Sequence, residues 1–234
     1  PKESVTDMLA GIRSDILPTI REKYSNVTIG FEGQSKDSAK TGRSAKTVVP
    51  IILIMMFAII VVTFRSFSQT ITVFAMIPFG FIGVAGGHFI HGMPISIMSM
   101  FGIIALIGIM VNDSLVLVTE MNYLLKDGMK FRDAVFKAGI TRFRPIVLTS
   151  VTTVAGLGPL ILETSRQAQF LIPMAVSVAY GIMVATTITL VVLPVALVLL
   201  NDIKYYLPKW LFKKKLTRED VEPAVRESRY EIEF

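Results

Sequence analysis

Residues Ile97–Thr119 read IMSMFGIIALIGIMVNDSLVLVT. As a helix rising about 1.5 Å per residue, this stretch is long enough to cross the roughly 30 Å hydrocarbon core of a membrane. Its apolar character is interrupted at Asn112 and Asp113. A charged side chain at the centre of a bilayer costs about 2.5–3.5 kcal/mol on insertion scales, so such residues usually face protein or water. The stretch therefore predicts a spanning helix that carries a polar site.

Four other apolar stretches lie on either side of this one, at 48–64, 70–90, 145–162 and 170–200. Each reaches or approaches the length of a membrane span, and the last exceeds it, which predicts a tilt, a projection beyond the bilayer, or a bend near Pro173 or Pro194. Five such stretches in succession disfavour the alternative of buried helices in a soluble core.

The composition agrees with a membrane protein, because 52% of the residues are hydrophobic and only 18% are charged. A disordered chain, a disulfide scaffold and an ordinary water-soluble enzyme all fit poorly. The absence of cysteine excludes thiol catalysis and cysteine-ligated metal, and no nucleophile–base set or phosphate-binding loop is visible. No cofactor and no metal site is therefore expected.

The first 47 residues have a different pattern. Apolar residues recur at helical spacing before Pro18, which is expected to bend or interrupt that helix; they are Val5, Met8, Leu9, Ile12, Ile16, Leu17 and Ile20. Val27, Ile29 and Phe31 alternate with polar residues, which predicts a strand ending at Gly33. Residues 33–47 are polar and lead into the first span. A helix and one strand cannot close a core by themselves, so we expect this segment to be part of a larger folded domain.

Basic residues predict the orientation of the spans. Five spans place the chain ends on opposite sides of the membrane, and the loop between the third and fourth spans has six basic residues: Lys126, Lys130, Arg132, Lys137, Arg142 and Arg144. The tail adds Lys204, Lys209 and the run Lys213–Lys215. The positive-inside rule therefore places the tail in the cytoplasm and the N-terminus outside. Residues 1–47, 48–200 and 201–234 are then an external segment, a membrane domain and a basic cytoplasmic tail.

Two basic segments have more than one interpretation. In the loop 120–144, Phe131, Ala134, Val135 and Ala138 share one helical face, which indicates a short amphipathic helix at the membrane surface, or a soluble connecting helix, between Gly128 and Gly139. The run Lys213–Lys215 follows three large apolar residues, which favours a membrane-surface helix over a nucleic-acid site.

The candidate chemical site is a polar layer within the spans. Asp113 lies about 9–10 Å from the end of its span near Glu120, and Thr149, Thr152 and Thr153 lie about 6–12 Å into the next span from the same side. If the two helices touch, Asn112 and Asp113 share a layer with these hydroxyls. Asp113 is then a titratable group among hydrogen-bonding partners. The alternative is a neutral Asp113 that only joins two helices.

Small residues form a second group of candidates. Gly80, Gly83, Gly86 and Gly87 lie in the second span, and Gly102 and Gly108 lie in the third. Glycines at such spacing let two helices approach closely, so we expect tight packing rather than a pore. His88 is expected to be a hydrogen-bonded residue near the outer surface, and the scattered methionines are more typical of packing than of copper handling.

Five strings in the chain resemble the resistance-nodulation-division (RND) transporters, most closely the acriflavine-resistance type of drug efflux pump. They are Phe64-Arg65-Ser66-Phe67, Ile77-Pro78-Phe79-Gly80 with Gly83, Gly108–Asp113, Arg142–Ile146 with Leu148-Thr149-Ser150, and Gly156–Leu160. The resemblance covers roughly residues 25–200 in the family's order. It implies a piece from the end of the second half of a pump with two six-span halves, beginning with a remnant of a periplasmic porter domain.

The expected fold class is accordingly an all-α polytopic membrane protein of five transmembrane helices with a small α/β periplasmic fragment at the N-terminus. The resemblance implies proton-driven drug export across a bacterial inner membrane, and a homotrimer working with a periplasmic adaptor and an outer-membrane channel. Membrane lipids are further partners, and nucleic acid is not.

The resemblance of the chain to this family also implies roles for single residues. Its central proton carriers are paired aspartates in the first half, outside this chain. Asn112 stands where many members have a lysine facing that pair, Asp113 stands where others have a second asparagine, and Thr149 and Arg142 match a relay threonine and a nearby arginine. Protein or lipid export is the alternative within the superfamily, and a membrane scaffold without transport is the alternative outside it.

Overall fold

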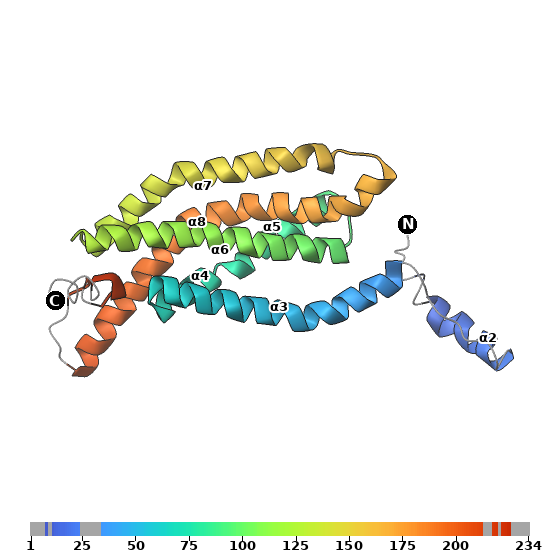
Figure 1. Cartoon of the computed structure of the whole chain (residues 1–234), viewed down its shortest axis with the longest axis horizontal. Coiled ribbons are helices and arrows are strands. Elements are labelled where there is room, and N and C mark those ends of the chain that lie inside the picture. The colour runs from blue at the N-terminus through green and yellow to red at the C-terminus, as the bar shows by residue number, and fades with distance from the viewer. Residues whose placement is uncertain (1–7, 9–10, 24–33, 213–216, 220, 226–234) are drawn as a thin grey trace. The chain divides into compact units, whose positions relative to one another are not determined.

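The structure is a computed structural model that describes residue 8 and residues 11–23, 34–212, 217–219 and 221–225. These residues belong to two compact units, 1–46 and 47–234, each considered by itself. Within the described ranges the chain is almost entirely helical and contains no strand (Figure 1).

In the first unit, a π-helical turn η1 (Ile12–Ile16) runs directly into α2 (Leu17–Lys23). Pro18 is the second residue of α2, and the helix continues past it. The strand predicted at Val27–Phe31 lies outside the described residues, so the α/β character of the N-terminal segment is not established. The polar residues before the first span are part of a helix, because α3 begins at Gln34 rather than near Val48. This part of α3 contains alanine and lysine, which favour helix, and no proline.

The prediction of five membrane spans is confirmed. The described residues contain five helical segments long and apolar enough to cross a membrane, namely Thr41–Phe64, Phe67–Ile90, Ile97–Lys126, Phe131–Ile161 and Gln167–Tyr206. They correspond to α3 (Gln34–Phe64), α4 (Phe67–Phe74) with α5 (Ile77–Ile90), α6 (Ile97–Lys126), α7 (Phe131–Ile161) and α8 (Arg166–Phe212). The last is continuous through Pro173 and Pro194 and, with 47 residues, extends well beyond the hydrocarbon thickness.

The second span is broken between α4 and α5. Pro78 stands in the first turn of α5, and its nitrogen has no hydrogen to continue the bonding pattern of α4. Ser66 starts α4 by accepting a hydrogen bond from the Gln69 amide at 3.3 Å. The break therefore follows from the sequence, although the apolar pattern alone predicts one continuous span.

The separate helix predicted at the membrane surface between Gly128 and Gly139 is wrong. Gly128 has φ +82° and lies in the turn before α7, but Gly139 is an interior residue of α7. Moreover, the apolar face on which that prediction rested is turned into the protein, since Phe131, Ala134, Val135 and Ala138 are all buried. The loop 120–144 is thus the extension of two spans rather than an independent element.

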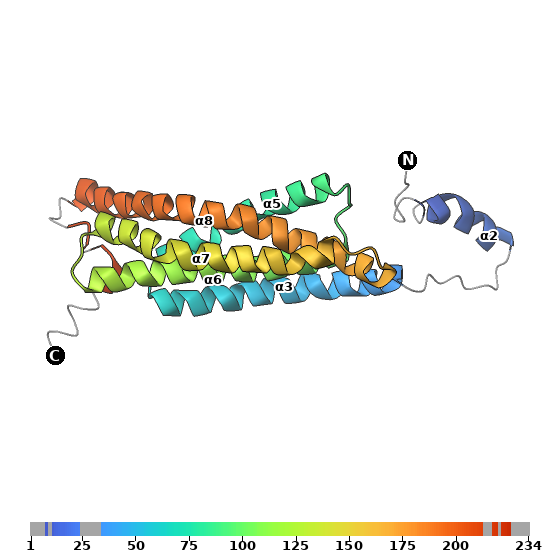
Figure 2. The ribbon, with the colours of Figure 1, turned by 90° about the horizontal axis from the view of Figure 1, so that it is seen from above.

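In the second unit, α8 packs against α4, α5, α6 and α7, and α6 packs also against α4, α5 and α7. Figures 1 and 2 show α6, α7 and α8 side by side along most of their length. The core of this bundle includes Leu106, Met110, Ile182 and Leu193. Most of the spanning part of α3 is exposed; Ile60 and Phe64 are its buried residues in the core.

Four of the predicted packing glycines lie at helix crossings. A Cβ on Gly83 would overlap the Tyr180 carbonyl oxygen of α8 and lie 2.9 Å from the Gly181 Cα, and one on Gly87 would lie 2.7 Å from the Tyr180 side chain. Gly80 faces Met110 of α6, and Gly102 faces Met174 and Ser177 of α8. Gly86, on the same helix as Gly83, has open space beside it.

Two histidines stabilise the end of the bundle where α5 ends and α6 begins. His88 is buried, its Nε2 lies 2.7 Å from the Ser99 hydroxyl, and Ser99 completes the capping box of α6. The His91 Nε2 lies 3.1 Å from the Tyr180 hydroxyl. His88 is therefore a hydrogen-bonded structural residue here, in agreement with the sequence interpretation.

At the opposite end, the tail returns to the bundle through a buried carboxylate. Glu222 is 1% exposed and accepts hydrogen bonds from the side-chain amides of Gln69 (2.9 Å, α4) and Asn201 (2.8 Å, α8). Gln69 in turn is bonded to Asn122 of α6, and Glu219 accepts a hydrogen bond at 3.2 Å from the first amide of α7. These partners offset the cost of burying the Glu222 carboxylate, and the segment is thereby bonded directly to α4, α7 and α8 and, through Gln69, to α6.

Candidate functional site

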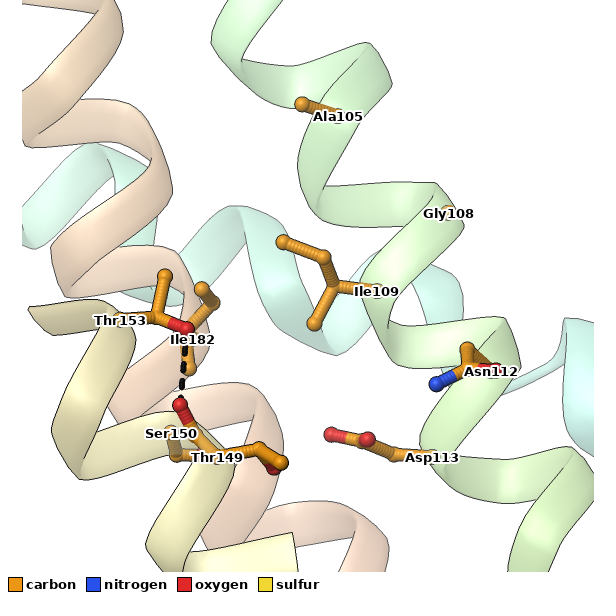
Figure 3. A pocket seen from close by; sticks show the side chains of 9 residues that line it. All are labelled: Ala105, Gly108, Ile109, Asn112, Asp113, Thr149, Ser150, Thr153 and Ile182. Atoms are coloured by element: carbon orange, nitrogen blue, oxygen red, sulfur yellow. Dashed lines mark hydrogen bonds between the residues drawn. The ribbon is translucent and has the colours of Figure 1, made fainter.

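A cavity of about 400 Å³ opens between α6, α7 and α8. Its lining comes from five residues of α6, three of α7 and one of α8: Ala105, Gly108, Ile109, Asn112, Asp113, Thr149, Ser150, Thr153 and Ile182 (Figure 3). Asp113 is the only titratable residue among them. Since all three helices are membrane spans, the cavity is a polar site within the membrane domain.

The carboxylate of Asp113 points from α6 across the cavity toward Thr149 and Ser150 of α7 (Figure 3). The residue is only 8% exposed, and Asn112 beside it is exposed on the open side of the cavity. No ion pair of Asp113 is present in the described part of the chain. Within the described residues, its carboxyl group thus faces hydroxyl groups rather than a cation.

The hydroxyl groups opposite Asp113 are already ordered by their own helix. The Thr149 hydroxyl donates to the Ile146 carbonyl at 2.9 Å, and the Thr153 hydroxyl donates to the Thr149 carbonyl at 2.7 Å. A hydroxyl that donates its hydrogen in this way keeps oxygen lone pairs that accept a hydrogen bond. Thr149 is thus prepared to accept from a protonated carboxyl.

A second hydroxyl pair closes the cavity toward α8. The Ser150 hydroxyl donates to the Ile146 carbonyl at 2.9 Å and lies 2.5 Å from the Thr186 hydroxyl. Because Ser150 uses its hydrogen on the carbonyl, Thr186 donates to Ser150. This short polar chain fixes α7 against α8 beside Asp113.

Arg142 lies outside the cavity, where its guanidinium forms an ion pair with Glu120 of α6 at 2.6 Å. Glu120 is seven residues beyond Asp113 on α6, and Arg142 is seven residues before Thr149 on α7. Both are therefore about 10.5 Å farther along their helices on the same side. The pair joins α6 to α7 next to the polar cavity without entering it.

The structure thus brings together three of the four proposed relay residues, Asn112, Asp113 and Thr149, and places Arg142 apart from them. Of the other threonines in the predicted layer, Thr153 lines the cavity, whereas Thr152 is exposed and bonds only to carbonyls of its own helix. Gly108 lines the cavity, and a Cβ there would meet no atom within 4 Å, so a packing role does not fit it among the described residues.

Sequence reasoning missed Ser150, Thr186 and Glu120. Ser150 adjoins Thr149, but a neighbour on a helix points about 100° away, so spacing alone did not link it to the site. The sequence did contain a signal for Glu120, because Glu120 lies seven residues after Asp113 and Arg142 lies seven residues before Thr149. The two residues are therefore expected at the same level of neighbouring helices. Thr186 had no such signal, because its pairing depends on how α8 crosses α7.

Comparison with known families assigns the class of protein. The model of the AcrB/AcrD/AcrF family matches residues 9–201, which is most of the chain. The chain belongs to this family of RND transporters, and the resemblance drawn from its motifs is confirmed.

Curated relatives include proteins with different described roles. The cobalt-zinc-cadmium resistance protein CzcA of Cupriavidus metallidurans is 33% identical over 150 residues, 64% of this chain and 14% of CzcA. The swarming motility protein SwrC of Bacillus subtilis is 30% identical over 194 residues, 82% of this chain and 18% of SwrC. The chain therefore spans less than a fifth of the length of these relatives.

Among solved structures, a heavy metal efflux pump is similar in fold, with a TM-score of 0.69 and 22% identity over 86% of this chain and 20% of the pump. Its second crystal form gives a TM-score of 0.65. Together with the five apolar helices, family membership supports a location in the inner membrane.

Proposed function

We propose that this chain is part of a proton-driven RND efflux pump and contributes a proton-responsive site to it, in which Asp113 takes up and releases a proton. The observation that carries the proposal is a single buried carboxyl facing ordered hydroxyls inside a cavity between membrane-spanning helices. When Asp113 is protonated it donates a hydrogen bond to Thr149, and when it is charged it requires a cation or water. The protonated and the charged state of Asp113 therefore favour different partners in the cavity. Coupling of proton uptake to transport requires such a difference.

Asn112 and Thr149 are exposed on the open side of the cavity, in the membrane-spanning parts of their helices. Polar groups at this depth require partners, so we propose that another part of the transporter covers them. By the family resemblance, this part is the first half with its aspartate pair. In the same way, we propose a homotrimer that works with a periplasmic adaptor and an outer-membrane channel. The porter remnant, the membrane domain and the basic tail keep the boundaries 1–47, 48–200 and 201–234.

The proposed cargo is hydrophobic or amphiphilic compounds, as the acriflavine-type motifs imply. A second candidate is divalent metal ions, favoured by the names of CzcA and of the structurally similar pump. In the described part of the chain there is no cluster of three or more metal-binding His, Cys, Asp or Glu residues, so a metal cargo would be bound elsewhere.

Reconstitution of the full-length protein tests both the coupling and the cargo. In vesicles with an imposed pH gradient, we expect ethidium to be moved against its concentration gradient and zinc not to be. Collapse of the gradient with a protonophore should stop this movement. Movement of zinc alone would support the metal candidate, and movement of either cargo without a pH gradient would contradict proton coupling.

We also propose that α7 begins on the cytoplasmic side and that the N-terminal segment is periplasmic, from the distribution of basic residues. In intact cells that produce the full-length protein without other cysteines, an impermeant thiol reagent should label Arg43→Cys and leave Lys130→Cys unlabelled. Both positions are exposed. The reverse pattern would invert the orientation.

A further inference from the structure

The first turns of α7 carry a row of large apolar side chains on the face opposite the protein core. Phe136, Ile140 and Phe143 are 72%, 61% and 56% exposed, respectively. Their spacing of four and three residues places them on one stripe of the helix. The buried face of the same turns consists of Phe131, Ala134, Val135 and Ala138, so this stripe is not a continuation of the core.

The stripe continues farther along α7. Val151, eleven residues beyond Ile140 and on nearly the same line of the helix, is 58% exposed. Among the described residues, no helix lies on the side of α7 that faces away from α6 and α8 (Figure 1). At about 46 Å, the 31 residues of α7 match the 40–45 Å thickness of a bilayer with its headgroup regions. Phe136, about 7.5 Å from the start of α7, therefore lies where the headgroups meet the hydrocarbon, and Ile140 and Phe143 lie deeper in the hydrocarbon.

Positive charge lies along one edge of this row. Lys137 and Arg144 are both exposed and are seven residues apart, which places them on nearly the same line of the helix. Asp133 is the one acidic residue in the first half of α7, against four basic ones: Arg132, Lys137, Arg142 and Arg144. Two of these are engaged elsewhere, Arg132 with Asp202 and Arg142 with Glu120. No ion pair of Lys137 or Arg144 is found among the described residues.

From this juxtaposition, we propose that Phe136, Ile140, Phe143, Lys137 and Arg144 form a binding site for an anionic phospholipid. The acyl chains lie along the aromatic and aliphatic row, and the phosphate lies between the two cations. Long basic side chains reach from apolar surroundings to the headgroup level, which is the geometry that Lys137 and Arg144 provide. The site does not rest on the transport mechanism, because it requires only that α7 spans the membrane.

A photoreactive side chain at the centre of the row tests the occupant directly. The full-length protein with p-benzoylphenylalanine in place of Ile140 is reconstituted in vesicles of phosphatidylethanolamine and phosphatidylglycerol in known proportion, irradiated, and analysed by mass spectrometry. We expect phosphatidylglycerol adducts to exceed its proportion in the vesicle about fivefold or more, the scale for one basic residue near an anionic surface. In the Lys137→Gln/Arg144→Gln variant, the share of phosphatidylglycerol among the adducts should fall to its share in the vesicle.

Matched variants separate a specific site from a general charge effect. Arg43→Gln/Lys46→Gln removes the same number of charges from exposed positions of α3 and should leave the enrichment unchanged. Lys137→Arg/Arg144→Lys keeps both charges and should retain it. The proposal would be overturned if, in the protein that keeps Lys137 and Arg144, the share of phosphatidylglycerol among the adducts equalled its share in the vesicle. Adducts to the protein itself would also overturn it, because they would mean that another segment covers this face.

Discussion

Replacement of Asp113 by asparagine is expected to abolish proton-coupled export by the full-length protein while leaving its expression and thermal stability close to normal. The amide has the size and shape of the carboxyl group and still forms hydrogen bonds, so the cavity between α6 and α7 persists. What is lost is the group that takes up and releases the proton. The transport rate at a fixed pH gradient should fall by about a hundredfold or more, the scale on which a group that transfers protons contributes.

Two threonines of α7 provide a matched pair for the same measurement. Thr149→Ala removes the acceptor that faces Asp113 and should lower the transport rate, although less than Asp113→Asn, because water can replace a hydroxyl oxygen. Thr152→Ala removes a hydroxyl that bonds only to the Leu148 and Thr149 carbonyls on the outer face and should be neutral. Full transport by the Asp113→Asn protein would instead favour a packing role for Asp113 and place the proton chemistry outside this chain.

The helices and the depth of the site were predictable because both follow from local rules. Runs of apolar residues define spans, and a rise of 1.5 Å per residue places Asp113 and Thr149 at one level. The strong signal of Pro78 also marks the break between α4 and α5, although hydropathy alone hides it. These features require no knowledge of how the helices cross.

Features that depend on how the helices cross and pack against one another were not predictable from the sequence in the same way. The face of α7 at Phe131–Ala138 is amphipathic by sequence whether its apolar side meets lipid or protein, and the structure buries it against the bundle. The network of Gln69, Asn122, Asn201 and Glu222 joins residues up to 153 positions apart. Each of these side chains is unremarkable in sequence, and only the return of the tail shows why they are buried.

The contact between α5 and α8 at Gly83 gives the largest expected effect on stability. A Cβ at this position would overlap the main-chain carbonyl of Tyr180 and approach the Gly181 Cα to 2.9 Å. Main-chain atoms inside a helix cannot rotate away as a side chain does, so the two helices must separate. Gly83→Leu should therefore destabilise the protein by about 3 kcal/mol or more, at the upper end of the range for overpacked sites.

Gly86→Leu is the control for this prediction, because Gly86 lies on the same helix and a Cβ there meets no atom within 4 Å. Both variants lose the same glycine flexibility and gain the same apolar side chain, so a difference between them isolates the helix contact. We expect the melting temperature of the purified protein in detergent, followed by circular dichroism, to fall clearly for Gly83→Leu and to change little for Gly86→Leu. Equal melting temperatures for the two variants would mean that α5 and α8 do not approach closely at Gly83, and would remove the packing role assigned to the glycines of this helix.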